Sequence, residues 1–89
     1  MIKIIDVRVE PNYSRRVRFN DHYDGMFDLN PLIDRNTGLT TPLRDRAFLG
    51  RVFLELGALA WPNGLELSPD PVHAELSETG RLVRHKAAA

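Results

Sequence analysis

Hydrophobic and polar residues alternate along three successive segments in the first third of the chain, residues 3–9, 13–19 and 23–29. A period of two places alternate side chains on opposite sides of an extended strand, so each segment is predicted to be a half-buried strand. Short sequences rich in Asn, Asp and Pro separate these segments and are typical of turns. Strands joined by tight turns pair antiparallel, and we therefore expect a three-stranded meander.

The first turn decides the register between the first two strands. A three-residue loop at 10–12 keeps both apolar sets on one face and pairs Ile5 with Val17. The same register places Arg15 among the apolar positions, and we expect its long side chain to reach solvent at a sheet edge. The opposite face of the meander is expected to meet solvent or another molecule, and it carries Asp6, Arg8, Arg16, Arg18, Asp24, Met26 and Asp28.

The second turn, residues 20–22, is also predicted to be a three-residue loop. The last residue of such a loop usually adopts a left-handed backbone conformation, and here that residue is His22. Histidine tolerates a positive φ better than most residues but less well than glycine, so we expect some strain in this turn.

Three segments carry the signals that start a helix. Asn30, Thr41 and Ser68 are capping residues, and each is followed by proline, which is favoured at the first helical position. The first signal predicts a single short turn, the second a helix over about 42–50, and the third a helix over 69–78. The side chains expected to face the sheet are Leu43, Ala47 and Phe48 in the second helix and Val72 and Leu76 in the third.

Residues 52–56 and 59–61 are predicted to form a small strand pair joined by a tight turn at 57–58. The expected fold class is α+β: an antiparallel three-stranded meander plus a small strand pair, with two or three short helices packed on the sheet. Residues 1–80 are expected to form a single α+β domain, and residues 81–89 a flexible C-terminal tail.

The composition is that of an ordinary soluble domain, because 43% of the 89 residues are hydrophobic and 27% are charged. Twelve Lys and Arg balance twelve Asp and Glu, which argues against a disordered tail or a polybasic nucleic-acid arm. The first residues do not have the pattern expected of a signal peptide, and no apolar run reaches the ~18–20 residues of a membrane span. We therefore expect a cytoplasmic protein with no membrane partner. Cysteine is absent, which excludes disulfides and Cys-based metal sites.

No residue pattern indicates catalysis. His22, His73 and His85 lie in a predicted turn, a helix and the tail, and none has the spacing of a zinc-binding motif. The carboxylates of Asp24 and Asp28 share an exposed face, where neither is desolvated enough for acid–base chemistry. No Gly-rich phosphate loop and no Ser–His neighbours occur. We therefore expect a protein that is not an enzyme and has no cofactor and no metal.

Three arginines are candidate partner contacts. Arg8, Arg16 and Arg18 share one strand face and form the best candidate for a phosphate-binding patch. Asp6 and Glu10 lie on the same face and partly neutralise this patch, so a charged, solvated face is the favoured interpretation.

Trp61 and Asn63 are two further candidate contacts. Trp61 is the sole tryptophan, and a Pro-Asn-Gly turn that contains Asn63 follows it directly. A single large aromatic residue most often belongs to the core, and this is the favoured interpretation. The alternative is an anchor for a partner, because tryptophan is enriched at the centres of interfaces.

Five short motifs resemble, in order and spacing, a bacterial family named only as domain of unknown function 2442. The motifs are Phe19-Asn20-Asp21-His22-Tyr23, Asp28-Leu29-Asn30-Pro31-Leu32, Pro42-Leu43-Arg44-Asp45, Trp61-Pro62-Asn63-Gly64 and Ser68-Pro69-Asp70. The resemblance covers about residues 2–76 and implies a fold similar to the N-terminal domain of a small bacterial regulator-like protein. Relatives commonly have Gly where this chain has His22. The resemblance supplies no catalytic residues.

Some relatives in this family carry a helix-turn-helix domain after the module, and this chain is expected to end too early to hold one. Other relatives are short chains encoded beside another small protein, in an arrangement similar to a toxin–antitoxin pair. The favoured hypothesis is therefore a non-enzymatic protein-interaction module that acts as an antitoxin-like or regulatory partner of a neighbouring small protein. Its expected partner is that other small protein or a second copy of the same chain. One alternative is a regulatory nucleic-acid-binding protein that uses the arginine face, although nucleic acid is not the expected partner of this chain alone. A second alternative is a small-ligand or enzymatic site at a dimer interface.

Overall fold

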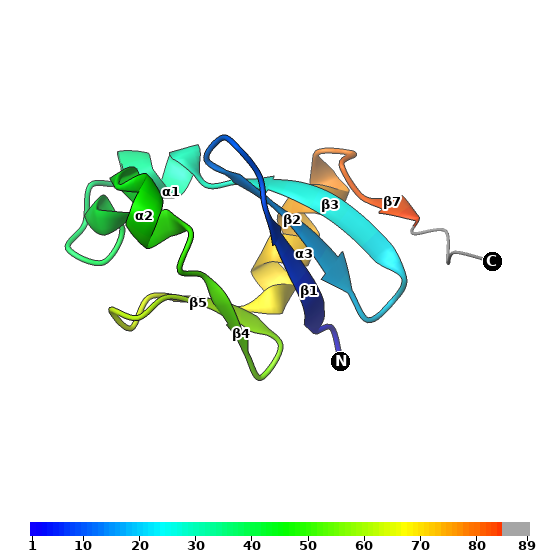
Figure 1. The fold of residues 1–89 in the computed structure, drawn as a ribbon. Helices are drawn as coiled ribbons and strands as arrows, with labels where there is room; N and C mark the ends of the chain where they lie inside the picture. The colour runs from blue at the N-terminus through cyan, green and yellow to red at the C-terminus, as the bar shows by residue number, and fades with distance from the viewer. Residues whose placement is uncertain (85–89) are drawn as a thin grey trace.

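The computed structural model describes residues 1–84 and shows two antiparallel sheets with a few short helices, which confirms the expected α+β class (Figure 1). The larger sheet has the strand order β1-β2-β3-β7, and the smaller sheet has the order β4-β5-β6. The strands are β1 (Ile4–Val9), β2 (Ser14–Phe19), β3 (Tyr23–Asp28), β4 (Phe53–Glu55), β5 (Ala58–Ala60), β6 (Glu66–Leu67) and β7 (Val83–Arg84). The helices are α1 (Asn30–Asp34), the 3-10 helix η1 (Thr41–Arg44), α2 (Arg46–Leu49) and α3 (Pro69–Glu78).

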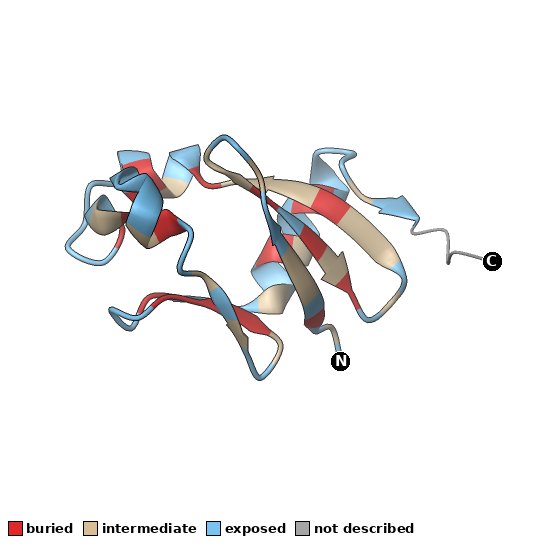
Figure 2. Cartoon of the chain, viewed as in Figure 1, coloured by how far each residue is buried: buried red, intermediate tan, exposed pale blue. Residues whose placement is uncertain are grey.

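Helix α3 covers the inner face of the larger sheet, and both elements carry buried residues (Figure 2). Val17 and Phe19 of β2 and Val72 and Leu76 of α3 belong to one buried core cluster. The helix approaches β3 closely at Gly25, where a Cβ atom would lie 2.6 Å from Cδ1 of Leu76. The predicted helix over 69–78 is confirmed, and Val72 and Leu76 are its buried residues. Ser68 occupies the predicted N-cap position, although its side chain makes no capping hydrogen bond.

The predicted register between β1 and β2 is wrong. Val7, not Ile5, pairs with Val17, and a β-bulge follows Ile4. The bulge reverses the alternation, because it turns Ile4 into the core and leaves Ile5 exposed. A single extra residue is enough to move a side chain from one face of a strand to the other, and the pattern of apolar and polar residues does not predict this bulge.

The connection between β1 and β2 is longer than the predicted three residues, because Val9 pairs with Arg15. The side chain of Asn12 accepts a hydrogen bond from the Ser14 amide at 3.0 Å and so shapes the turn. Arg15 is 1% exposed in the central part of the sheet, so the expectation that it reaches solvent at an edge is also wrong.

The second hairpin is confirmed as predicted. Arg18 pairs with Asp24, which leaves a three-residue loop at 20–22 beyond the Phe19–Tyr23 positions. His22 has a φ of +71° and donates its amide to the Phe19 carbonyl at 3.2 Å. The left-handed position therefore holds histidine, as the sequence indicated.

The predicted helix over about 42–50 is divided into η1 and α2. Asp45 between them has an extended backbone, and its carboxylate accepts a hydrogen bond from the Ala47 amide at 3.0 Å. This new start rotates the second half of the segment, so Leu49 is buried and Ala47 is exposed, contrary to expectation.

Two of the predicted capping side chains have other partners. Asn30 is the first residue of α1 rather than its cap, and its side-chain amide donates to the Asp28 carboxylate at 2.8 Å. The Thr41 hydroxyl donates to the Thr37 carbonyl at 2.7 Å. Pro31 and Pro42 nevertheless lie in the first turns of α1 and η1. Backbone N–H groups have no partner within the helix there, so the missing N–H of proline costs nothing.

The smaller sheet has one strand more than predicted, because β6 pairs with β5. The turn between β4 and β5 lies at Leu56 and Gly57, one residue before the predicted 57–58, because Ala58 is already part of β5.

The predicted tail begins inside the larger sheet rather than outside it. Val83 and Arg84 form β7 and pair with Asp24 and Tyr23 of β3. The rest of the predicted tail, residues 85–89 with His85, lies outside the described residues.

Candidate functional site

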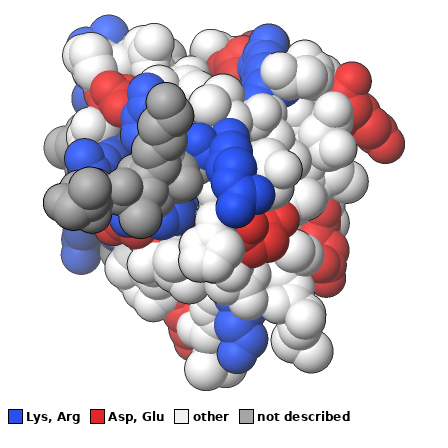
Figure 3. All heavy atoms as spheres, turned by 90° about the vertical axis from the view of Figure 1, so that its right-hand side faces the viewer, with Lys and Arg blue, Asp and Glu red and all other residues white. Residues whose placement is uncertain are grey.

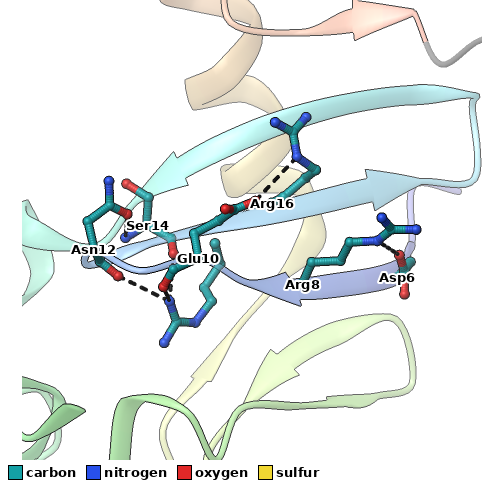
Figure 4. A network of polar contacts seen from close by, with 7 residues as sticks. Asp6, Arg8, Glu10, Asn12, Ser14 and Arg16 are labelled. Carbon is teal, nitrogen blue, oxygen red and sulfur yellow. Dashed lines mark hydrogen bonds and ion pairs between the residues drawn. The ribbon is translucent and has the colours of Figure 1, made fainter.

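The three candidate arginines lie on the outer face of the larger sheet, and each has an acidic partner within the chain. The Nε atom of Arg8 lies 3.3 Å from Asp6, and that of Arg18 lies 3.3 Å from Asp24. Arg16 pairs with Glu10 at 3.5 Å across the end of the hairpin (Figure 4). A phosphate would have to compete with a carboxylate at every one of these positions.

Charges of both signs also mix at the end of the molecule that carries β7. Basic and acidic side chains lie next to one another there, rather than in separate regions (Figure 3). Nucleic-acid binders usually present a continuous basic surface, because most of their affinity comes from phosphate contacts. The arrangement of charges therefore gives little support to the nucleic-acid alternative.

Trp61 is 1% exposed and lies in the core, which confirms the favoured interpretation of this residue. Its indole Nε1 donates a hydrogen bond to the Leu49 carbonyl at 3.2 Å, so its polar atom also has a partner inside the chain. Asn63 is exposed, and its amide donates to the Leu39 carbonyl at 3.1 Å while its oxygen accepts from the Leu65 amide at 3.1 Å. Both residues hold the fold around the smaller sheet, and Trp61 offers no surface to a partner.

Arg15 is a buried cation that organises the loop between β1 and β2. Its Nη1 atom donates to the carbonyl oxygens of Glu10, Asn12 and Ser14, at 3.3, 3.3 and 2.6 Å. Burial lowers the pKa of the guanidinium below its ordinary value, and the Glu10 carboxylate partly offsets this change. Its Nε atom is buried and has no partner among the described residues. The side chain is buried and holds the loop through its Nη1 atom, so we interpret it as a structural rather than a binding group.

A groove of about 430 Å³ lies between α1, β6 and α3. Its apolar floor consists of Phe27, Leu32, Leu67 and Val72. Pro31 and Pro71 form part of its walls, and proline brings an apolar surface that loses little conformational entropy on binding. We call this feature the α1–α3 groove.

The rim of the α1–α3 groove carries two carboxylates that have no ion-pair partner in the described part of the chain. Glu66 and Glu75 are both exposed and lie at this rim, together with Arg35. Asp28 also lines the groove, but its carboxylate already accepts two hydrogen bonds from Asn30. The site therefore combines an apolar floor with a net negative rim, which suits an apolar side chain that is flanked by basic residues.

Sequence reasoning missed this groove. Its residues come from the end of one strand, two helices and a two-residue strand that was not predicted. Of these residues, Phe27 was expected on the apolar face of its strand and Val72 on the buried face of its helix. The proline-containing helix starts that build the walls were visible, but the approach of α1 to α3 depends on the whole fold.

A histidine–aspartate pair was missed as well. His73 Nε2 donates to Asp21 Oδ2 at 2.7 Å, and its ring meets the Phe19 ring edge-on at a centroid distance of 4.8 Å. The Asp21 carboxylate also accepts from the Tyr23 amide at 3.2 Å. The pair joins the β2–β3 turn to α3. Because its two residues are 52 positions apart in the sequence, local sequence patterns could not predict it.

Within residues 1–84, no three His, Cys, Asp or Glu side chains lie together as metal ligands would. No helix in the same part of the chain has the length and apolar character needed to cross a membrane.

Residues 4–75 match a family model described as "Protein of unknown function (DUF2442)". The match covers most of the 89-residue chain and confirms the family that the motifs suggested. Comparisons with curated proteins and with solved structures found no match. The expected likeness of fold to a regulator-like protein stays a prediction.

Proposed function

The chain belongs to the DUF2442 family of proteins of unknown function, and we propose that it is a non-enzymatic protein-interaction module that binds a segment of another small protein in the α1–α3 groove. The observation that carries the proposal is a groove with a partly buried apolar floor beside two carboxylates that have no ion-pair partner within residues 1–84. A concave site with an apolar lining and a few polar groups at its edge is typical of a binding groove.

The chemistry of the groove defines the partner. About 430 Å³ is room for one or two large apolar side chains, which would contact Phe27, Leu32 and Leu67. A Lys or Arg beside these side chains would meet Glu66 or Glu75 at the rim. Such rim pairs contribute more to specificity and to the rate of association than to affinity. The expected partner segment is therefore apolar with basic neighbours.

The resemblance to short chains encoded beside another small protein supports a finer proposal. The partner would be the product of such a neighbouring gene, and the chain would act on it as an antitoxin-like or regulatory subunit in the cytoplasm. The proposal assigns the chain binding rather than chemistry, as the sequence pattern led us to expect.

Reversal of the rim charge should release this partner. In the double variant Glu66→Lys/Glu75→Lys, basic residues of the partner would meet lysines, and we expect its recovery with the tagged chain to fall by about tenfold or more. Both residues are exposed, so the fold should be unaffected. The measurement is co-purification from the source cells at physiological salt, quantified by protein mass spectrometry.

The matched control is Glu55→Lys/Glu78→Lys, which makes the same change of charge at two exposed glutamates outside the groove. We expect this control to recover the partner as the wild type does. Equal recovery with both double variants, recovery of nucleic acid instead of a protein, or a wild-type chain that brings down no stoichiometric protein would contradict the proposal.

A further inference from the structure

Leu56 stands in a conformation and an environment that do not suit leucine. Its side chain is 93% exposed at the tip of the β4–β5 hairpin. Its φ is +51°, and Gly57 follows with a φ of +84°, so both central residues of the turn are left-handed. Such turns favour Asn-Gly, and a bulky residue at the first position is strained. Because the side chain of Leu56 is exposed, it makes few packing contacts within the chain that could compensate for this strain.

The strained turn is fixed against the first strand. The carbonyl of Gly57 accepts a hydrogen bond from the Ile4 amide at 2.9 Å. A Cβ atom on Gly57 would lie 2.8 Å from the side chain of Lys3, so the two backbones are in close contact. Strand β4 then runs beside β1 (Figure 1). Leu56 is therefore held in place by a rigid support.

Most of the exposed large apolar side chains lie on these two neighbouring elements. Ile5 is 54% exposed, Val9 62% and Phe53 42%. With Leu56 they define what we call the β1–β4 seam, whose hairpin tip is exposed in Figure 2. Exposed large apolar side chains on two neighbouring elements of a small chain are candidates for an interaction surface.

We propose that the β1–β4 seam is the contact between two copies of this chain, with Leu56 of each copy packed against the other. The charges along β1 favour a second copy over a different partner. Asp6 and Arg8 lie on either side of Val7, so a two-fold axis near Val7 would place Asp6 of one copy opposite Arg8 of the other. The order of charges along β1 is thus complementary to the β1 strand of a second copy that runs antiparallel to it. The zero net charge of the chain adds no long-range repulsion.

The seam shares no residue with the α1–α3 groove. Dimerisation and capture of another protein can therefore succeed or fail independently. Four apolar side chains per copy form a small interface, and we expect a dimer of micromolar rather than nanomolar affinity.

The test compares the wild type with Leu56→Asn and with the control Leu39→Asn, which changes a half-exposed leucine outside the seam. Sedimentation velocity between about 5 and about 500 μM spans the expected dissociation constant. We expect a dimer of the wild type and of the control at high concentration. Leu56→Asn should weaken dimerisation by about tenfold or more.

Thermal unfolding at low concentration separates this role from a structural one. Asparagine suits the left-handed position, so we expect Leu56→Asn to raise Tm by about 3–6 °C while it weakens the dimer. The proposal is overturned by a wild type that stays monomeric over the whole range. It is also overturned if both variants weaken the dimer equally, or if Leu56→Asn lowers Tm.

Discussion

Replacement of Trp61 by alanine should lower the free energy of unfolding by about 3–5 kcal/mol, the usual loss for a large buried aromatic residue. Trp61 is 1% exposed, so its removal leaves a cavity in the core. It also leaves the Leu49 carbonyl without its indole donor. A domain of this size has a total stability of about 5–15 kcal/mol, so the variant should be close to unfolding at 37 °C. Urea denaturation followed by far-UV circular dichroism measures the change.

The variant Trp61→Phe serves as the control for this prediction. It keeps most of the apolar area but removes the hydrogen bond to Leu49, and we expect a smaller loss of about 1–2 kcal/mol. If Trp61→Ala unfolds at the urea concentration of the wild type, Trp61 does not support the core, and its role as a partner anchor returns.

Replacement of Arg15 by alanine should lower the free energy of unfolding by about 2–4 kcal/mol. Three carbonyl oxygens, those of Glu10, Asn12 and Ser14, would lose their shared donor. The apolar stem of the arginine would also leave a void beside the central strand. Amide hydrogen exchange should show the β1–β2 loop opening first, because the guanidinium holds it closed.

Lysine at position 15 is the informative comparison. Its ammonium group can donate to the same carbonyls, so Arg15→Lys should recover at least half of the stability lost in Arg15→Ala. A loss below about 0.5 kcal/mol in Arg15→Ala would show that water replaces the guanidinium without penalty, and the structural role assigned to it would be wrong.

The sequence predicts those parts of the fold that local signals determine. The hairpin with His22 and the helix over 69–78 follow from alternation, loop length and a Ser-Pro start, and both are confirmed. Alternation failed at the bulge after Ile4, because one inserted residue leaves no mark in a sequence that is apolar at both positions. The helix over 42–50 failed at Asp45, which serves as a cap inside an otherwise helical pattern.

The candidate site was harder to predict than the fold. The arginine face was correctly identified as a set of residues on one face, and so was its partial neutralisation by Asp6 and Glu10. The α1–α3 groove was not identified, because Phe27, Leu32 and Leu67 are each typical core residues in their own segments. In the fold these three residues are only partly buried, and they line the groove between α1, β6 and α3. A local pattern shows that a residue is apolar but not which neighbour fails to cover it.

The buried Arg15 illustrates the same limit. The predicted register put Arg15 on the apolar face, and the observed register agrees. We expected its side chain to reach solvent, but it is buried. The carbonyl groups of a neighbouring loop compensate for its burial, and their positions depend on the turn geometry around Asn12.

The central claim is that a partner protein occupies the α1–α3 groove, and site-specific photo-crosslinking in the source cells tests it most directly. A photo-reactive amino acid in place of Leu32 lies on the groove floor, and the same amino acid in place of Leu39 lies outside it. We expect one small protein to crosslink from position 32 and not from position 39, and Glu66→Lys/Glu75→Lys to abolish that crosslink. A partner that crosslinks from position 39 alone, or no crosslinked protein from position 32, would contradict the proposed function.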